Sequence, residues 1–226
     1  LTEEIISSLF NLTFDLTAFY DEVRNDPILS KLTQQLRGLK SPTTPTVFEA
    51  LVDSIIEQQI SLNVAHSIER NVIKTFGDLL TVDDHLYYAF PTPHQLACAT
   101  VEQLRNCGLS VRKVEYIHDI SKAIVDGELN FERFKTYEHV EEIIKELCKI
   151  RGVGVWTAEL TMLRGMHKLE ALPADDLGLR RDISHYYCTD RTISSEEARR
   201  IAEGWGKWKG LAGFYVLIGA RLRVEV

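Results

Sequence analysis

The sequence predicts an all-α protein, and three observations support this prediction. Apolar residues recur at the three- and four-residue spacing of amphipathic helices along much of the chain. Alternation of apolar and polar residues, as in strands, is rare, and no strand–helix–strand unit is apparent. Apolar residues make up 45% of the 226 positions, enough to build an ordinary core, which argues against disorder.

The first three predicted helices lie between residues 46 and 127. The segment 46–60 begins at Thr46, a good N-cap after Pro42 and Pro45, and its apolar face holds Phe48, Leu51, Val52, Ile55 and Ile56. A second helix closes at Gly77 after the stripe Val64, Ile68 and Val72. A third begins at Ser110 and stops at Gly127.

Three further helices are predicted toward the end of the sequence. Residues 139–149 repeat the helical pattern through Val140, Ile143, Ile144 and Leu147. Ser194 precedes two glutamates and a helical stretch, which is typical of a helix start. Residues 209–224 form a long and mostly apolar last helix.

Composition and charge are those of an ordinary intracellular enzyme. The formal charge is −7, but residues 109–170 hold eleven acids against ten bases, so a locally basic face is compatible with the acidic total. The four cysteines are scattered without metal-ligand spacing, and we expect reduced thiols. No signal peptide and no membrane partner are expected, because no apolar run approaches the ~20 residues of a membrane span.

The segment 147–158 is the most informative part of the sequence. A predicted helix ends near Ile150, a Gly152-Val153-Gly154 turn follows, and a second helix starts near Val155. Amides of such a turn and of the next helix's first turn form a nest that suits a DNA phosphate. Glycines chosen only to make a corner explain the same pattern equally well.

Four segments together resemble helix-hairpin-helix (HhH-GPD) DNA glycosylases of the 3-methyladenine DNA glycosylase II, or AlkA-like, branch. The hairpin is Ile150–Ala158, IRGVGVWTA, and the segment 172–179, LPADDLGL, resembles the loop with the catalytic aspartate. The segment 48–61 resembles the helix and wedge loop of that branch, and 108–117 fits a further segment. The motifs occur in the family's order and span roughly residues 46–210.

The resemblance implies a compact form of this fold without the N-terminal β lobe of longer members. Two helical lobes with a cleft between them are expected. Residues 1–52 plus 170–226 would form a terminal lobe, and 53–169 the helix-hairpin-helix lobe.

By the same resemblance, Asp176 is the expected catalytic residue. A fixed carboxylate stabilises the oxocarbenium-like cation formed when a base–sugar bond breaks, and it orients the attacking water. The alternative is that Asp175 and Asp176 only cap the following helix. Given the hairpin upstream, we assign catalysis to Asp176 and a capping or supporting role to Asp175.

The expected base pocket contains Trp156, Trp208 and Leu160. Strand-cleaving members place a lysine at the position of Trp156, because an amine can form a Schiff base with the sugar. The indole therefore implies a monofunctional enzyme that uses water, and its face suits a positively charged alkylated purine. Either tryptophan could instead be a plain core residue.

The wedge and minor-groove positions are Gln58, Gln59 and Ser61. A wedge side chain fills the gap left by a flipped nucleotide, and we favour Gln59 over Gln58. The alternative is a solvated amide pair at a helix end. Glu57 departs from the pattern, since related members usually have a small residue there. A carboxylate at this place would oppose phosphates and implies a slow or even inactive enzyme. The alternative is that Glu57 points to solvent, pairs with a lysine or arginine and has no effect.

The expected phosphate-binding residues of the hairpin are Arg151, Gly152, Val153, Gly154 and Thr157. Members of the superfamily often hold a monovalent cation there, which implies a structural Na or K ion on the carbonyls of Cys148, Ile150 and Val153. No other cofactor is expected.

Three functions are compatible with the sequence. The first is a monofunctional alkylpurine DNA glycosylase in base-excision repair, acting as a monomer on double-stranded DNA with alkylated or abasic sites, in the nucleus if the source is eukaryotic. The second is a glycosylase-like protein that binds damaged DNA with little turnover. The third is an all-α interaction protein whose Gly-Val-Gly is only a turn.

Overall fold

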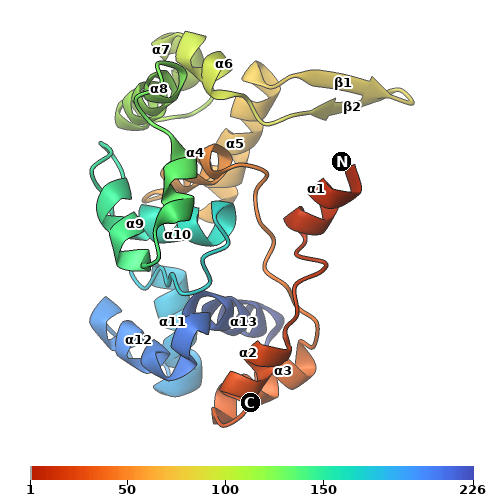
Figure 1. Ribbon diagram of the computed structural model, residues 1–226, viewed down its shortest axis with the longest axis vertical. Coiled ribbons are helices and arrows are strands. Elements are labelled where there is room, and N and C mark those ends of the chain that lie inside the picture. Colours follow the sequence, from red (N-terminus) through yellow and green to blue (C-terminus); the bar gives the residue numbers. More distant parts are fainter. Residues whose placement is uncertain (1) are drawn as a thin grey trace. The chain divides into compact units, whose positions relative to one another are not determined.

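The computed structural model describes residues 2–226, apart from the side chains of Thr2 and Lys135. It is mostly helical, as predicted (Figure 1). The chain divides into two compact units. A terminal unit combines the chain up to Pro45 with Glu159–Val226, and a middle unit is Thr46–Ala158. The sequence placed the two boundaries between the units after residue 52 and before residue 170, somewhat later along the chain than the structure does.

The middle unit contains the predicted helices of residues 46–149. Its elements are α4 (Val47–Glu57), α5 (Leu62–Phe76), β1 (Leu79–Val82), β2 (His85–Tyr88), α6 (Pro93–Cys98), α7 (Val101–Asn106), α8 (Val111–Val125), the 3₁₀ helix η1 (Phe131–Thr136) and α9 (Val140–Leu147). Thr46 caps α4 by accepting from the Glu49 amide, and Ser110 caps α8 by accepting from the Lys113 amide. Both predicted N-caps are therefore confirmed.

The core of the middle unit forms where α8 meets its neighbours. Helices α4, α6 and α7 all pack against α8, and α5 packs against α4. The fully buried side chains at these contacts include Leu51, Ile55, Ile56, Leu96, Leu104 and Ile117. This packing fixes the C-terminal end of α4 relative to the first turn of α8.

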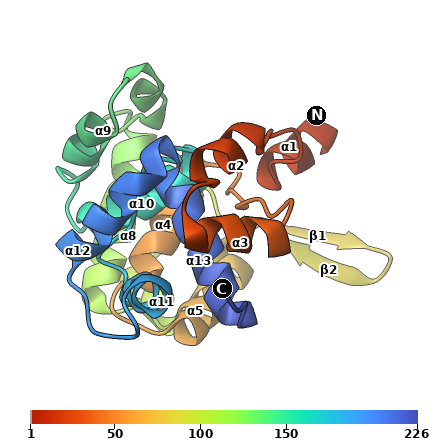
Figure 2. The same cartoon turned by 90° about the horizontal axis from the view of Figure 1, so that it is seen from below.

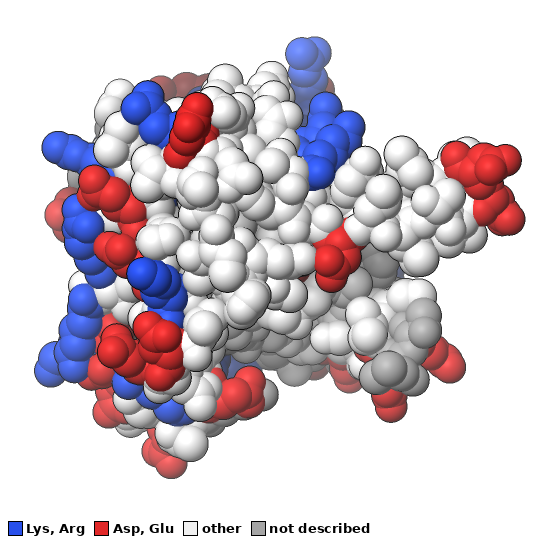
Figure 3. Space-filling model, turned by 90° about the horizontal axis from the view of Figure 1, so that it is seen from above, with Lys and Arg blue, Asp and Glu red and all other residues white. Residues whose placement is uncertain are grey.

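A two-stranded antiparallel hairpin, β1–β2, was not predicted. Its apolar side chains are exposed on both faces, so the sequence lacks the apolar/polar alternation by which half-buried strands are recognised. The turn Asp83-Asp84 has both residues at positive φ, and these acids form the tip (Figure 3). At the base, a Cβ on Gly77 would lie 2.0 Å from the Ala89 carbonyl oxygen. Glycine ends α5 there because of this close approach, since its φ of −76° is not left-handed.

The terminal unit is built around the last helix. Its elements are α1 (Thr2–Leu9), α2 (Thr17–Val23), α3 (Pro27–Gln35), α11 (Leu177–Tyr187), α12 (Ser195–Ala202), the 3₁₀ helix η2 (Glu203–Trp208) and α13 (Lys209–Leu222); α10 (Val155–Gly165) begins in the middle unit and ends here. Helix α13 packs against α3 and α11 (Figure 2). Phe19, Leu32, Trp205 and Tyr215 are completely buried in this core.

Two sequence predictions for this unit are confirmed. Ser194 caps α12 by accepting from the Glu197 amide, and the last helix begins at Lys209. The short helices α1, α2 and α3 were not predicted. In the described part of the chain, no helix combines the length and the apolar character needed to cross a membrane.

Candidate active site

The predicted hairpin is a tight turn between α9 and α10. The Ile150 amide donates to the Leu147 carbonyl and the Val153 amide to the Ile150 carbonyl, both at 3.0 Å. Gly152 has φ +88°, and a Cβ there would lie 2.3 Å from the Tyr116 ring. At Gly154, by contrast, a Cβ would meet no atom within 4 Å. Gly152 is therefore required by the turn itself, whereas the backbone at Gly154 is open to approach.

The expected phosphate donors of the hairpin divide into two groups. The Val153 amide is engaged by the Ile150 carbonyl, which corrects its assignment as a phosphate donor. The hydroxyl of Thr157 is buried and accepts from Gln58, so only the main-chain amide of Thr157 is suited to a phosphate. The amides of Gly152 and Gly154 and of the first turn of α10 remain the candidates.

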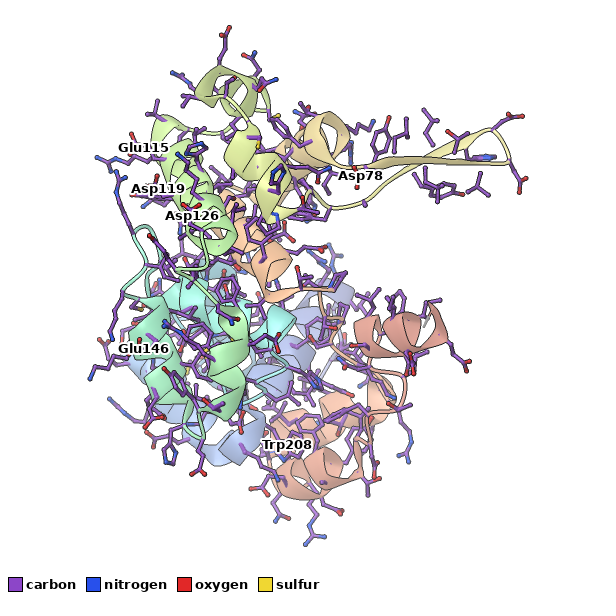
Figure 4. The ribbon with its side chains drawn as sticks, turned by 45° about the horizontal axis from the view of Figure 1, so that its top comes forward. Asp78, Glu115, Asp119, Asp126, Glu146 and Trp208 are labelled. Carbon is purple, nitrogen blue, oxygen red and sulfur yellow. The ribbon has the colours of Figure 1, made fainter. Side chains whose placement is uncertain are left out.

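The side chain of Arg151 is exposed, but its guanidinium binds acids of α8. Its guanidinium pairs with Glu115 and donates at 3.2 Å to Asp119, and Figure 4 labels these two acids on α8. It also lies 5.4 Å from the centre of the Tyr116 ring. The hydrogen bond and charge of Glu115 raise the pKa of Arg151. A phosphate that binds Arg151 must compete with two carboxylates, which weakens the contribution of this side chain.

The structure separates the two glutamines of the predicted wedge. Gln58 Nε2 donates to the Gly152 carbonyl and to Thr157 Oγ1, both at 2.9 Å. Gln59 is exposed and has φ +56°. Ser61 is exposed at the start of α5, and Glu57 is the half-buried last residue of α4. Gln59 and Ser61 are thus accessible, whereas Gln58 is bound to the hairpin.

Asp176 is the N-cap of α11. Its Oδ1 accepts from the Leu179 amide at 2.8 Å, and the side chain is half-buried. The cap expected of Asp175 is therefore made by Asp176. One oxygen of Asp176 engages the helix, and the positive end of the helix dipole stabilises its negative charge. Capping and catalysis, which the sequence presented as alternatives, are compatible in one residue.

Asp175 belongs to a charged network that the sequence did not reveal. Arg199 on α12 binds both carboxylate oxygens of Glu159, at 2.6 and 3.0 Å, and also reaches Asp175 at 3.4 Å. The same guanidinium donates to the Leu172 carbonyl at 3.0 Å. Glu159 is only 2% exposed, and burial raises its pKa although Arg199 opposes the shift. Arg199 thereby anchors the loop that leads to Asp176.

The expected pocket residues differ in exposure. Trp156 and Leu160 on α10 are half-buried. Trp208 is 8% exposed and packs edge-on against Phe14 and Phe19, and so belongs to the core of the terminal unit. Of the expected pocket side chains, Trp156 and Leu160 are the more accessible.

The predicted cation positions lie in the hairpin turn. Cys148 caps α9, and the bond from Val153 to the Ile150 carbonyl curls residues 150–153 into a turn. A carbonyl oxygen has a second lone pair, so Ile150 can still serve as a ligand. Among the described residues, no group of three His, Cys, Asp or Glu side chains is arranged to hold a metal ion.

The chain is similar to known proteins in both sequence and fold. The family described as HhH-GPD superfamily base excision DNA repair protein matches residues 52–207. The DNA-3-methyladenine glycosylase of Bacillus subtilis (strain 168) is 33% identical over 95% of this chain and 71% of its own length. The structure of 3-methyladenine DNA-glycosylase from Archaeoglobus fulgidus aligns with 100% of this chain and 76% of that one, at a TM-score of 0.88 and 33% identity.

A DNA complex is among the similar structures. Clostridium acetobutylicum 8-oxoguanine glycosylase/lyase, bound to double-stranded DNA with cytosine opposite 8-oxoG, aligns with a TM-score of 0.86 and 27% identity. The alignment covers 98% of this chain and 75% of that one.

Proposed function

Because the chain belongs to the HhH-GPD superfamily of base excision DNA repair proteins, we propose that it is a monofunctional alkylpurine DNA glycosylase. Its substrate would be double-stranded DNA with a methylated purine, and its product an abasic site. The observation that carries this proposal is Asp176, a half-buried carboxylate held at the start of α11 in the segment that resembles the family's catalytic loop.

The proposed reaction is hydrolysis of the N-glycosidic bond. The bond from C1′ of the sugar to the purine breaks, and the base leaves with the electron pair. Asp176 stabilises the positive charge that develops on the sugar, and its second oxygen orients a water. That water attacks C1′ and passes a proton to the carboxylate of Asp176, which releases it to the solvent. A purine methylated at N3 or N7 is already cationic in the nucleotide, so it leaves as a neutral base without strong acid catalysis.

The other residues support binding and specificity in this proposal. Trp156 offers an aromatic face to the cationic base, and Leu160 an apolar contact. Gln59 fills the gap in the stack, Ser61 faces the minor groove, and the amides around Gly154 bind phosphate.

The oligomeric state, the location and the cation are further parts of this proposal. We propose that the protein acts as a monomer, and in the nucleus if the source is eukaryotic. A Na or K ion on the carbonyls of Cys148, Ile150 and Val153 would add positive charge beside the hairpin. The effect of Glu57 on the rate remains a prediction.

Release of free methylated purines from DNA treated with a methylating agent tests the function. Wild-type protein should release them, and Asp176→Asn should abolish release while retaining affinity for abasic duplex. Asp175→Asn is the matched control and should retain excision. Excision at the normal rate by Asp176→Asn would contradict the assignment. Binding without release by the wild type would favour a damage-binding protein.

Borohydride trapping tests the monofunctional mechanism. Trp156 has no amine, so no covalent protein–DNA adduct should form under borohydride. A trapped adduct would show that another residue attacks the sugar and that the enzyme also cleaves the strand.

A further inference from the structure

The turn after α4 presents Gln59 in a backbone conformation that its surroundings must maintain. Helix α4 ends at Glu57, Gln58 has ψ 126°, and Gln59 follows with φ +56°. This left-handed region is unfavourable for any residue other than glycine, because the Cβ crowds the backbone. The exposed Gln59 side chain makes none of the hydrogen bonds described for this turn, so the conformation is maintained by its neighbours.

The first support is the buried side chain of Lys113 in the first turn of α8. Its ammonium donates to the Ile56 carbonyl at 2.8 Å and to the Gln58 carbonyl at 2.7 Å. Lys113 is only 9% exposed, and burial lowers its pKa. A cation that binds the last carbonyls of a helix is favoured by the helix dipole, and here it also joins the helix to the residue before Gln59.

The second support is Gln58 itself. Its amide nitrogen donates one hydrogen to the Gly152 carbonyl and the other to Thr157 Oγ1. Gly152 lies in the hairpin and Thr157 in the first turn of α10, so the side chain crosses from the end of α4 to the predicted phosphate site. Because Gly152 is itself packed against Tyr116 on α8, both supports lead back to that helix.

We propose that Lys113 and Gln58 form a brace that makes the Gln59 turn and the hairpin one rigid DNA-binding element. The proposal rests on the proposed function, in which Gln59 enters the gap left by the extruded base. Lys113 and Gln58 are positioning residues. They fix where Gln59 stands relative to the phosphate-binding amides, so that docking of the hairpin aims the wedge.

A double-mutant cycle separates this role from a merely structural one. The variants are Lys113→Met, Gln59→Ala and the pair, with Arg112→Met as the control because Arg112 is the exposed cation next to Lys113. The probe is a duplex with 2-aminopurine opposite an abasic-site analogue, whose fluorescence reports disturbance of the stack. Single-turnover release of methylated purine is measured in parallel.

If the brace aims the wedge, Lys113→Met and Gln59→Ala should each reduce the fluorescence change and the release rate about tenfold. The double variant should have a fluorescence change and a release rate no more than about threefold below those of either single variant, because each change removes the same interaction. Lys113→Arg, which keeps the donors, should recover most of the signal, and Arg112→Met should match the wild type.

A purely structural role predicts a different result. The losses in the double variant would then multiply, and Lys113→Met would lower the melting temperature without a specific loss of fluorescence change; either result overturns the brace. If Lys113→Met does not fold, Gln58→Met tests the same cycle with Lys113 intact. A wild type that changes the fluorescence but releases no base contradicts the proposed function alone. A wild type that leaves the fluorescence unchanged overturns the brace.

Discussion

Two loops in different units carry the candidate functional residues, and a cation holds each of them in a different way. In the middle unit, Lys113 binds two neutral carbonyls beside the Gln59 turn. In the terminal unit, Arg199 binds the Leu172 carbonyl and also the buried carboxylate of Glu159. The difference lies in what remains when the cation is removed. Loss of Lys113 leaves polar but neutral groups, whereas loss of Arg199 leaves a buried charge.

This comparison predicts that Arg199→Ala has the largest effect on stability. Removing the partly exposed guanidinium leaves the buried Glu159 carboxylate without its partner, which should cost about 3 kcal/mol. Leaving carbonyls unsatisfied in Lys113→Met should cost about 1–2 kcal/mol. Urea denaturation measures both. Arg200→Ala, at the exposed next position on α12, should stay within about 0.5 kcal/mol of the wild type.

The double variant Arg199→Leu with Glu159→Leu sharpens the prediction for Arg199. It should recover much of the lost stability, because no charge is left buried. A double variant as unstable as Arg199→Ala would show that the guanidinium acts through its packing instead.

Gly152→Ala should produce the next largest effect. The alanine Cβ would clash with the Tyr116 ring, and the backbone of Gly152 is in the left-handed region. The carbonyl of Gly152 also accepts a hydrogen bond from Gln58. We expect a loss of about 2 kcal/mol in the free energy of unfolding. Gly154→Ala is the matched control, since its Cβ meets nothing within 4 Å and its φ is not positive. Equal losses in the two variants would contradict this account of the turn.

A half-buried acid in the middle unit gives a smaller, pH-dependent effect. Burial and the nearby Glu69 raise the pKa of Glu49 to about 7, whereas Glu159 in the other unit has Arg199 as a partner. A raised carboxyl pKa means that the folded state binds more protons, so stability decreases as pH rises from about 4.5 to about 7.

Glu49→Gln should therefore stabilise the protein by about 1 kcal/mol above pH 7, after allowance for partial exposure of the side chain. The gain should vanish below pH 4.5, where both states are protonated. Thermal melts across this range measure it, and a gain that does not depend on pH would refute the pKa assignment.

The smallest effect on stability is expected for Gly154→Asp. The open space around Gly154 should keep unfolding within about 0.5 kcal/mol of the wild type. Its affinity for duplex DNA should nevertheless fall sharply, because the carboxylate repels phosphate. Because two acids engage Arg151, the affinity of the wild type for DNA should depend only weakly on salt. Each phosphate contact adds roughly 0.9 to the slope of log affinity against log salt concentration. Unchanged binding would place the DNA elsewhere.

Much of the fold was predictable because its signals are local. The side chains of the N-caps Thr46, Ser110 and Ser194 each accept a hydrogen bond from the amide three residues later, a spacing that is visible in the sequence. The hairpin glycines are visible in the same way. The sequence could not show that only Gly152 faces a ring, because Tyr116 lies far from it along the chain.

The candidate site was predicted less completely because its supports join distant segments. In the sequence, Lys113 looks like an ordinary charged residue of an amphipathic helix. The ion pair of Glu159 and Arg199 joins residues forty positions apart, so no local pattern indicates it. The strands β1 and β2 were missed because both of their faces are exposed. The adjacent acids Asp83 and Asp84 between apolar runs were the available signal for that turn.

Contacts at the base of the β1–β2 hairpin hold its two ends together, so the hairpin can be changed independently of the helices. A Cβ on Gly77 would clash with the Ala89 carbonyl, and the Ala89 amide donates to the Asp78 carbonyl. The carboxylate of Asp78, which Figure 4 labels, accepts from Gln95 at 2.7 Å, so the two ends of the ribbon are held together. Beyond this closure the strands bind mainly each other, and the tip is solvent-exposed. Loop tips of this kind tolerate insertions. The ribbon can therefore be lengthened, shortened or fitted with a reporter peptide between Asp83 and Asp84 while the helices below keep their packing.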